Sequence, residues 1–480
     1  LAKRIILIPN IYSLLAIIIF YFRRFEKMEA TSRKLPFGFY VCAISYSFER
    51  LAYYAAKWGM VVFAVLQVAK GGLGLTKAEG ALLQSWLVAF TYITPLIGGW
   101  IADKWVSPRI LVPVGELLMG AGYFVAWQAT SKTSLILCIA LVAIGTGFFK
   151  GVLSGVNGRQ FEGEDQLLIK VFSWQYSFVN VGSFCGTTFL SLIALKYGYR
   201  SLFLACGIFM VIDTLWWLFG VRFLKNDAGK RPFKVDNRSE ETNETVEKTV
   251  EPLTLREKKR VAAIVIVTVF SGIFWLIWYM VYMPVYYEFG PAGQGGKGWA
   301  DWTIGNFTMP TAWFDSANGL FCIILCPIFA TIWYKMSKRA KGDWSMWKKT
   351  AIGILLLGFC ILFMVFAAML AKEGKGTPVG IWIIILAAFS MTVGEVVFSP
   401  LGNAFINEYA PKQLLGTLLG VWPFVIFFAG LGYGPLYNFL ERFSFIKAYG
   451  VVAALILACG FVMLAFDKRF MRLVNDEDEK

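Results

Sequence analysis

A carboxylate and a guanidinium stand next to each other inside an apolar stretch of this sequence. Glu49 and Arg50 lie within residues 36–69, a run long enough to cross a bilayer as one helix. A charge in the middle of a membrane costs at least a few kcal/mol on insertion scales, so such residues usually face a cavity and act there. The alternative is a structural ion pair that locks helices together. We favour a ligand-facing site.

The neighbouring residues strengthen this interpretation. On a helix, residues spaced by three and four share one face. Here that face carries four polar or aromatic side chains, Tyr46, Arg50, Tyr53 and Lys57. Glu49 and Tyr54 flank it. This face of the helix cannot lie against lipid.

Polar residues interrupt other apolar runs as well. Lys150 has apolar residues on both sides, which disfavours a lysine that only reaches for the membrane surface. Asn180 is either a ligand-binding residue or a hydrogen-bond partner of a neighbouring helix. Glu395 precedes a Ser-Pro kink, but a kink alone needs no acid. Glu116 is expected to pair with Arg109.

The composition is that of a membrane protein. Hydrophobic residues make up 58% of the 480 residues and charged residues only 16%, against about 25% charged in a typical soluble domain. Spans of about 20 apolar residues are long enough to cross the bilayer as helices. Twelve are predicted: 36–69, 78–102, 110–129, 134–157, 171–195, 201–223, 259–287, 311–335, 348–371, 379–405, 413–438 and 446–467.

A polar, highly charged segment divides these spans into two groups of six. We predict an all-α membrane protein with two six-helix halves. The expected divisions are an N-terminal extension and cytoplasmic start (1–35), an N-terminal bundle (36–223), a linker (224–258), a C-terminal bundle (259–467) and a cytoplasmic tail (468–480). Residues 1–27 are interpreted as an upstream extension or a peripheral helix, since Met28 opens an ordinary cytoplasmic start.

Lysine and arginine fall mainly in alternate loops, which predicts that both termini and the linker are cytoplasmic. The compact loops favour a bacterial inner membrane. The net charge of +15 is explained by a basic face against anionic lipid, so no nucleic-acid partner is expected. We expect a monomer.

The reactive residue types argue against an enzyme. Histidine is absent, and no nucleophile is paired with a base. The eight cysteines lie in apolar runs without a Cys-x-x-Cys pair, so they are expected to be core residues. No metal site or cofactor is expected.

Several motifs, in order along both halves, resemble the proton-dependent oligopeptide transporters, called the POT family, of the major facilitator superfamily. Gly98–Lys104 resembles the superfamily's loop motif. The family motifs are Glu49-Arg50-Leu51-Ala52-Tyr53-Tyr54, Gly145-Thr146-Gly147-Phe148-Phe149-Lys150, the stretch from Phe172 to Ser183, Trp313–Asn318, Gly394–Gly402 and Gly420-Val421-Trp422. The resemblance covers residues 36 to about 465.

The resemblance implies secondary transport of di- and tripeptides by alternating access, coupled to protons. Arg50 and Lys150 would attract the peptide carboxylate and Glu395 its amino end, while Asn180 would bond its backbone. Side-chain pockets would come from four aromatic residues, Tyr53, Tyr54, Tyr92 and Trp422. Glu49, Lys150 and Glu395 are the expected proton-coupling residues.

The sequence departs from the family at two carboxylates. The motif Glu-x-x-Glu-Arg has Tyr46 at its first position, and the seventh span has Tyr279 or a neighbour where the family carries a glutamate. The remaining cavity charges, Glu49 and Glu395 against Arg50, Lys57 and Lys150, sum to about +1. We hypothesise that Lys150 holds a proton only when a substrate carboxylate is present.

Three alternatives stay open. A positive cavity would suit acidic peptides or small organic or inorganic anions. Without the two acids, the protein would be an uncoupled facilitator. A receptor or scaffold that has lost transport is disfavoured, because Arg50, Lys150, Asn180, Glu395 and Trp422 all remain.

Overall fold

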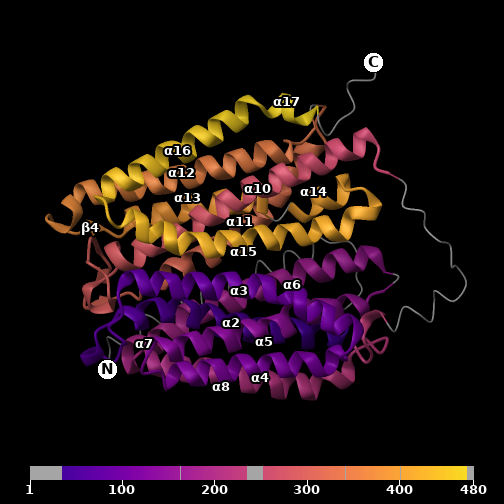
Figure 1. Ribbon diagram of the computed structural model, residues 1–480, viewed down its shortest axis with the longest axis horizontal. Coiled ribbons are helices and arrows are strands. Elements are labelled where there is room, and N and C mark those ends of the chain that lie inside the picture. Colours follow the sequence, from indigo (N-terminus) through magenta and orange to yellow (C-terminus); the bar gives the residue numbers. More distant parts are fainter. Residues whose placement is uncertain (1–34, 163, 235–251, 341, 400–401, 473–480) are drawn as a thin grey trace, which may run out of the picture.

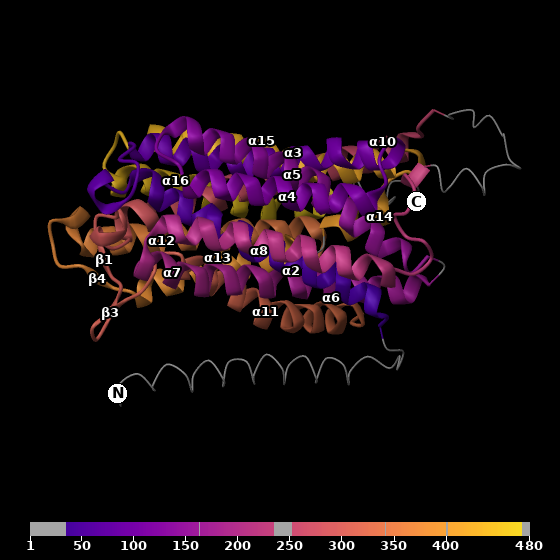
Figure 2. The same ribbon diagram turned by 90° about the horizontal axis from the view of Figure 1, so that it is seen from below.

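Long helices lying side by side form almost the whole molecule. The computed structural model describes residues 35–162, 164–234, 252–340, 342–399 and 402–472. The predicted extension 1–27, the middle of the linker and the end of the tail fall outside these residues. Two groups of helices pack against each other, one from each half of the chain (Figures 1 and 2). This is the all-α, two-group architecture that the apolar spans predict.

The first half of the chain forms six membrane-length units. They are α2 (Phe37–Val65), α3 (Lys77–Lys104), α4 (Pro108–Trp127), α5 (Lys132–Arg159), α6 (Asp165–Cys185) with η3 (Gly186–Leu190) and α7 (Ser191–Tyr197), and α8 (Tyr199–Gly220). Short turns η2 (Val68–Lys70) and η4 (Val221–Phe223) follow α2 and α8.

The second half repeats this plan with more interruptions. Its helices are α10 (Leu255–Pro284) with η5 (Val285–Phe289), α11 (Trp313–Ser337), α12 (Met346–Leu370), α13 (Trp382–Phe398), α14 (Gly402–Tyr409), α15 (Leu415–Leu440), α16 (Phe445–Ala465) and α17 (Asp467–Met471). The turns η6 (Ala292–Gln294), η7 (Lys372–Gly374) and η9 (Lys412–Leu414) lie in its connections.

Twelve helical units correspond to the twelve predicted spans. Ten described helices are long and apolar enough to cross a membrane, and α13 is a shorter apolar helix. The twelfth, α2, has 29 residues but carries Glu49, Arg50 and Lys57. Two predicted boundaries are wrong. Within the predicted span 379–405, α13 ends at Phe398 and a separate helix, α14, begins at Gly402, and α6 begins at Asp165 rather than at 171.

Local sequence explains where several helices begin and how closely they pack. Thr76 and Glu79 form a capping box at the start of α3, with each side chain satisfying a backbone N–H of the other residue. Further along α3, Gly98 meets α5 so closely that an added Cβ would lie 1.9 Å from the Gly147 carbonyl oxygen. Glycine is therefore required for this backbone approach.

Two small sheets lie in the loops at one end of the bundle. Strand β1 (Ala300–Asp301) pairs in parallel with β4 (Val379–Gly380), and β2 (Thr303–Ile304) pairs antiparallel with β3 (Phe307–Thr308). In β1 and β4, Ala300 lies opposite Val379. The β1–β4 pair ties the α10–α11 loop to the α12–α13 loop.

Each half has its own apolar core, but the two cores differ in one respect. The core of the N-terminal half contains only residues of that half. The core of the C-terminal half also takes in five buried residues of α2 and α3, namely Trp58, Val61, Val62, Ala81 and Val88. The halves are therefore packed together where these five residues lie.

Hydrogen bonds between the halves gather at the same place. Ser85 donates to the Gly430 carbonyl at 2.7 Å, Tyr433 donates to Gln84 at 2.9 Å, and Ser316 donates to Thr187 at 2.9 Å. We call this region the joined end; it comprises 58–62, 77–92, 187–188, 279–289, 313–316 and 430–438. All of these residues lie toward the helix ends remote from the linker.

Candidate functional site

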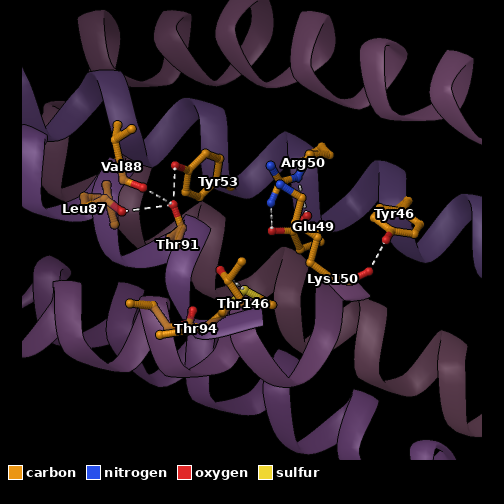
Figure 3. Close-up of polar contacts among 12 residues, drawn as sticks. Tyr46, Glu49, Arg50, Tyr53, Leu87, Val88, Thr91, Thr94, Thr146 and Lys150 are labelled. Carbon is orange, nitrogen blue, oxygen red and sulfur yellow. Dashed lines mark hydrogen bonds and ion pairs between the residues drawn. The ribbon is translucent and has the colours of Figure 1, made fainter. Parts of the chain in front are cut away.

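The Glu49–Arg50 pair forms the centre of the polar region in α2. The Arg50 guanidinium donates through Nε and Nη2 to the two carboxylate oxygens of Glu49, and both side chains are buried (Figure 3). A two-pronged pair of this kind fixes the plane of both groups. The Arg50 guanidinium also lies 4.5 Å from the centre of the Tyr53 ring. The structure thus pairs Glu49 and Arg50 with each other within α2, the ion pair that the sequence analysis gave as the alternative.

Tyr46 fills the position at which the family motif carries its first glutamate. Its hydroxyl donates to the main-chain carbonyl of Lys150 (Figure 3) and shares a 2.6 Å hydrogen bond with Ser154. Ser154 in turn accepts a 3.1 Å bond from Gln175 of α6. Tyr46 therefore joins α2, α5 and α6 through neutral groups and adds no charge.

Three of the predicted pocket tyrosines lie close to the cations Arg50 and Lys150. The Tyr53 hydroxyl bonds Thr91 of α3 at 3.1 Å (Figure 3), and Tyr54 flanks Arg50. The Lys150 ammonium lies 4.6 Å from the centre of the Tyr92 ring. Lys150 is half-buried at the middle of α5 and has no acid within ion-pair distance among the described residues. Its charge is thus available to a ligand.

Glu395 comes from the other half of the molecule. Its carboxylate accepts a 3.0 Å hydrogen bond from the Asn318 amide of α11, and the same amide contacts Thr392 at 3.0 Å. Glu395 is half-buried in the last turn of α13. The predicted acid and the predicted bases therefore stand on opposite halves.

Asn180 and Trp422 are less closely tied to the group. The Asn180 amide donates to the Tyr176 carbonyl of its own helix at 2.9 Å, and its side chain is partly exposed. The Trp422 ring lies against Gly402, where an added Cβ would be 2.4 Å from it. No contact between Trp422 and the other candidate residues is found in the described parts of the chain.

Asp315 is a charged residue that the sequence analysis named only as part of a motif. It lies in the first turn of α11, is 2% exposed, and accepts a 2.9 Å bond from Tyr282. With Asp315 counted, three acids face three bases in this region. The expected sum of about +1 did not include Asp315; with it, the formal charges of the three acids and three bases balance.

Glu116 does not pair with Arg109, contrary to expectation. Arg109 donates to the Ala228 carbonyl at 3.0 Å. The Glu116 carboxyl is fully buried beside Asp213 of α8, and neither acid has a basic partner among the described residues. Only the packing of α4 against α8 brings these two acids together, so sequence reasoning missed Asp213.

The seventh-span position predicted to replace a glutamate is also filled by a neutral group. Tyr279 donates to the Tyr92 hydroxyl at 3.3 Å, which connects α10 to α3 across the two halves. Its ring is buried and stacks on Tyr433. A hydrogen bond here takes the place of a charge.

Known proteins resemble this chain along most of its length. It is 24% identical over 435 residues to the uncharacterized transporter YclF of Bacillus subtilis (strain 168), covering 81% of this chain and 84% of that one. It is 25% identical over 427 residues to dipeptide and tripeptide permease A of Escherichia coli (strain K12), covering 83% of each. These relatives are transporters, as expected for a chain that is not an enzyme.

Solved structures show the same fold. A mutant of peptide transporter POT in complex with alafosfalin aligns with a TM-score of 0.80 at 22% identity, covering 92% of this chain and 96% of that one. A POT family transporter in complex with 5-aminolevulinic acid aligns with a TM-score of 0.79 at 20% identity, covering 91% and 97%. The twelve-helix fold predicted from the sequence is confirmed.

The family profile of the Major Facilitator Superfamily matches residues 50–435, from Arg50 in α2 to the joined end of α15. The resemblance to POT transporters inferred from the motifs is confirmed by the relatives and structures above. The chain is a multi-pass membrane protein that belongs to the Major Facilitator Superfamily.

Proposed function

We propose that this protein imports di- and tripeptides by alternating access, driven by protons. One observation carries the proposal: the cations Arg50 and Lys150 lie on the first half and the acid Glu395 lies on the second. A peptide has opposite charges at its two ends. Its carboxylate would bind the first half and its ammonium the second, so the bound peptide would bridge the two halves.

The residues of the first half suit a carboxylate. The Arg50 guanidinium presents a planar fork that matches two carboxylate oxygens. In the structure this fork is occupied by Glu49. A proton on Glu49 would release the fork for the peptide, so proton binding and peptide binding would favour each other. Lys150 adds a point charge, and it would hold its proton once the peptide carboxylate is present.

The aromatic and amide residues would contact the rest of the peptide. Tyr53, Tyr54 and Tyr92 surround the cations and offer contact area at low entropy cost. Asn180 would bond the peptide backbone after releasing the Tyr176 carbonyl. Trp422 would form part of a side-chain pocket after the halves move.

The joined end supports alternating access. The hydrogen bonds described above between the two halves gather at the helix ends remote from the linker. With the linker and both termini in the cytoplasm of a bacterial inner membrane, this arrangement is closed to the outside. Rocking the halves would open the joined end and expose the peptide site to the other side.

The names of known proteins support the substrate class. Permease A of Escherichia coli is named for dipeptides and tripeptides, and one similar structure is a peptide transporter. With Asp315 counted, the formal charges of the site balance, which weakens the argument for an anionic substrate. Acidic peptides, small anions and an uncoupled facilitator remain as outcomes of the test.

The test is uptake of labelled dialanine into liposomes that contain the purified monomer, with and without an inward proton gradient. Accumulation above the outside concentration supports coupled import, and simple equilibration indicates a facilitator. Absence of uptake contradicts the proposal and directs the test to anions. Lys150→Ala should abolish accumulation, whereas Lys132→Ala, at the start of the same helix, should retain it.

A further inference from the structure

Lys57 is a buried ammonium with an unusual set of neighbours. It lies in the second half of α2 and is 3% exposed. Within the described part of the chain, its ammonium has no hydrogen-bond or ion-pair partner. Five aromatic rings surround it, with ring centres 4.2–6.0 Å from Nζ: Trp58, Tyr279, Tyr54, Trp278 and Tyr282. The ring faces attract a cation but leave its charge uncompensated.

Asp315 contacts the same group of rings through Tyr282. Its carboxylate accepts the Tyr282 hydroxyl at 2.9 Å. The Tyr282 ring stacks on Trp58 with centres 4.1 Å apart, and the Trp58 ring lies 4.2 Å from the Lys57 ammonium. Lys57 and Asp315 therefore contact the same pair of stacked rings, and their opposite charges attract each other.

This attraction acts between the two halves at the joined end. Lys57 belongs to α2, whereas Asp315 and Tyr282 belong to α11 and α10. Buried charges are weakly screened, so the attraction is felt beyond ion-pair distance. Neutralising Asp315 would remove the main charge of the second half that attracts Lys57.

We propose that Asp315 is the proton-binding group that controls the joined end, with Lys57 as its counter-charge. A proton from the aqueous phase beyond the joined end binds a carboxylate oxygen of Asp315, and the Lys57 ammonium keeps its own proton. The cross-half attraction is then lost and the joined end opens. This inference rests on the proposed function, because it assigns the proton step of that transport.

Several titratable groups lie around Asp315, and all of them influence how readily its carboxylate binds a proton. They are Lys57 and Tyr54 of α2, Tyr282 and Tyr286 of α10, Cys322 of its own helix and Glu395 of α13. The phenols and the thiol are neutral near pH 7 in ordinary proteins. The charged members are Lys57, Asp315 and Glu395. Lys57 favours the Asp315 carboxylate, whereas Glu395 opposes it.

Asp315 fits the gating role better than Glu395 does. The Glu395 carboxylate is held by Asn318 within its own half. Asp315 instead bonds Tyr282, whose ring is in direct contact with Trp58 of the other half. A change at Asp315 is thus transmitted to the first half through one stacked pair, and Glu395 stays available for the peptide ammonium.

The first experiment measures opening without any peptide. Spin labels at Val68 and Ile304, exposed residues on the two halves beyond the joined end, report their separation in lipid nanodiscs. The partly exposed Cys185, Cys326 and Cys459 are replaced beforehand. We expect the separation to increase as the pH falls from about 8 to about 5, because burial favours the protonated, neutral form of a carboxyl group.

Asp315→Asn is the decisive variant, because asparagine is neutral at every pH. In this variant the two spin labels should be far apart at every pH tested. The pH-dependent change in the population with the larger label separation should be smaller than in the parent protein by about fivefold or more. Asp301→Asn removes an exposed acid at the same end and should behave like the parent protein. A parent-like pH response in Asp315→Asn would overturn the inference, whether or not the protein transports peptides.

Transport separates this inference from the proposed function. Asp315→Asn should still exchange dialanine across liposomes but should no longer accumulate it with a proton gradient. If Asp315→Asn fails to exchange, the double variant Lys57→Met with Asp315→Asn removes both charges and should recover exchange without accumulation. Recovered accumulation in that double variant would show a purely structural pair and refute the inference.

Discussion

Arg50 is held in one plane by its two bonds to Glu49 and by the Tyr53 ring. The site therefore depends on the shape of the guanidinium as well as on its charge. A lysine would keep the charge but present only a point, with no second prong for a carboxylate. This distinction can be measured.

Arg50→Lys should raise the KM for dialanine about tenfold, equivalent to about 1.4 kcal/mol of lost binding. Transport measured at several peptide concentrations in liposomes gives this value. Arg222→Lys is the control, since Arg222 is exposed at the surface beside Phe219 and Phe223. Equal KM values for Arg50→Lys and the parent would contradict a direct role for the fork.

Residue types in the sequence predicted part of this site and missed another part. Glu49, Arg50 and Lys150 were found because a charge inside an apolar run is expensive and therefore conspicuous. Asp315 lies near the start of its span, where a charged residue is common and does not by itself indicate a functional site. Its burial depends on the packing of α11 against the Trp58–Tyr282 stack. The balance of formal charges could not be predicted without that contact.

At the scale of elements, the contact of α3 with α5 fixes how close Tyr92 comes to Lys150. Gly98 and Gly147 let the two backbones meet, and Thr94 also donates to the Ala143 carbonyl at 2.6 Å. The next residue along α3, Gly99, has no atom near its missing Cβ. A side chain at position 98 would therefore clash with α5, whereas one at position 99 would not.

Gly98→Ala should destabilise the protein by about 1–3 kcal/mol, because the new methyl group overlaps the Gly147 carbonyl. Gly99→Ala should leave stability unchanged or raise it slightly, since alanine is the better helix former. Thermal unfolding in detergent compares the two variants. Equal melting temperatures would show that α3 and α5 do not touch at Gly98.

The start of α16 depends on an acid from a neighbouring loop. Glu373 accepts a 3.0 Å bond from the Ile446 backbone N–H and a 2.7 Å bond from Ser444, and the Ile446 bond chiefly lowers the pKa of its carboxyl. An acid whose pKa is lowered by folding stabilises the protein above its unfolded pKa. That stability is lost as the pH falls through the folded pKa.

Glu373→Gln should therefore lower stability at about pH 7 by about 0.5–1 kcal/mol, the contribution of a negative charge at a helix N-terminus. At about pH 3 the difference from the parent should disappear, since the parent carboxyl is then neutral too. Melting temperatures at the two pH values test this. Glu441→Gln, an exposed acid nearby, should show no such pH-dependent difference.

Helix positions were predicted well because twelve long apolar runs are separated by polar loops. The break between α13 and α14 could not be placed, since residues 379–405 read as one apolar run. The α4–α8 contact that buries Glu116 beside Asp213 was equally invisible. Such pairings depend on which helix faces which, and a hydrophobic pattern does not contain that information.

At the scale of the whole molecule, hydrogen bonds and ion pairs between the two halves gather at the joined end. Lys77, the first residue of α3, bonds Glu288 of the other half at 3.1 Å. Lys132, the first residue of α5, bonds Glu79 of its own half at the same distance. Each lysine is the first residue of its helix and pairs with a glutamate. Only the Lys77–Glu288 pair joins the two halves.

Lys77→Ala should increase the open population of the joined end about fivefold, corresponding to about 1 kcal/mol for a partly buried ion pair. Lys132→Ala should leave that population unchanged. Spin labels at Val68 and Ile304 report both results. Glu288 keeps its 2.6 Å pair with Lys297, so Lys77→Ala does not leave a buried acid alone. Identical label distances in the two variants would contradict this account of the joined end.

The unequal cores of the two halves bear on how the chain is made. The N-terminal half completes its core from its own residues, whereas the core of the C-terminal half includes Trp58, Val61, Val62, Ala81 and Val88 of the first half. During synthesis the first half emerges from the ribosome earlier, so it can fold in the membrane before the second half exists. It then offers a finished surface on which the second half assembles. The order of translation is thus the order in which the two cores can be completed.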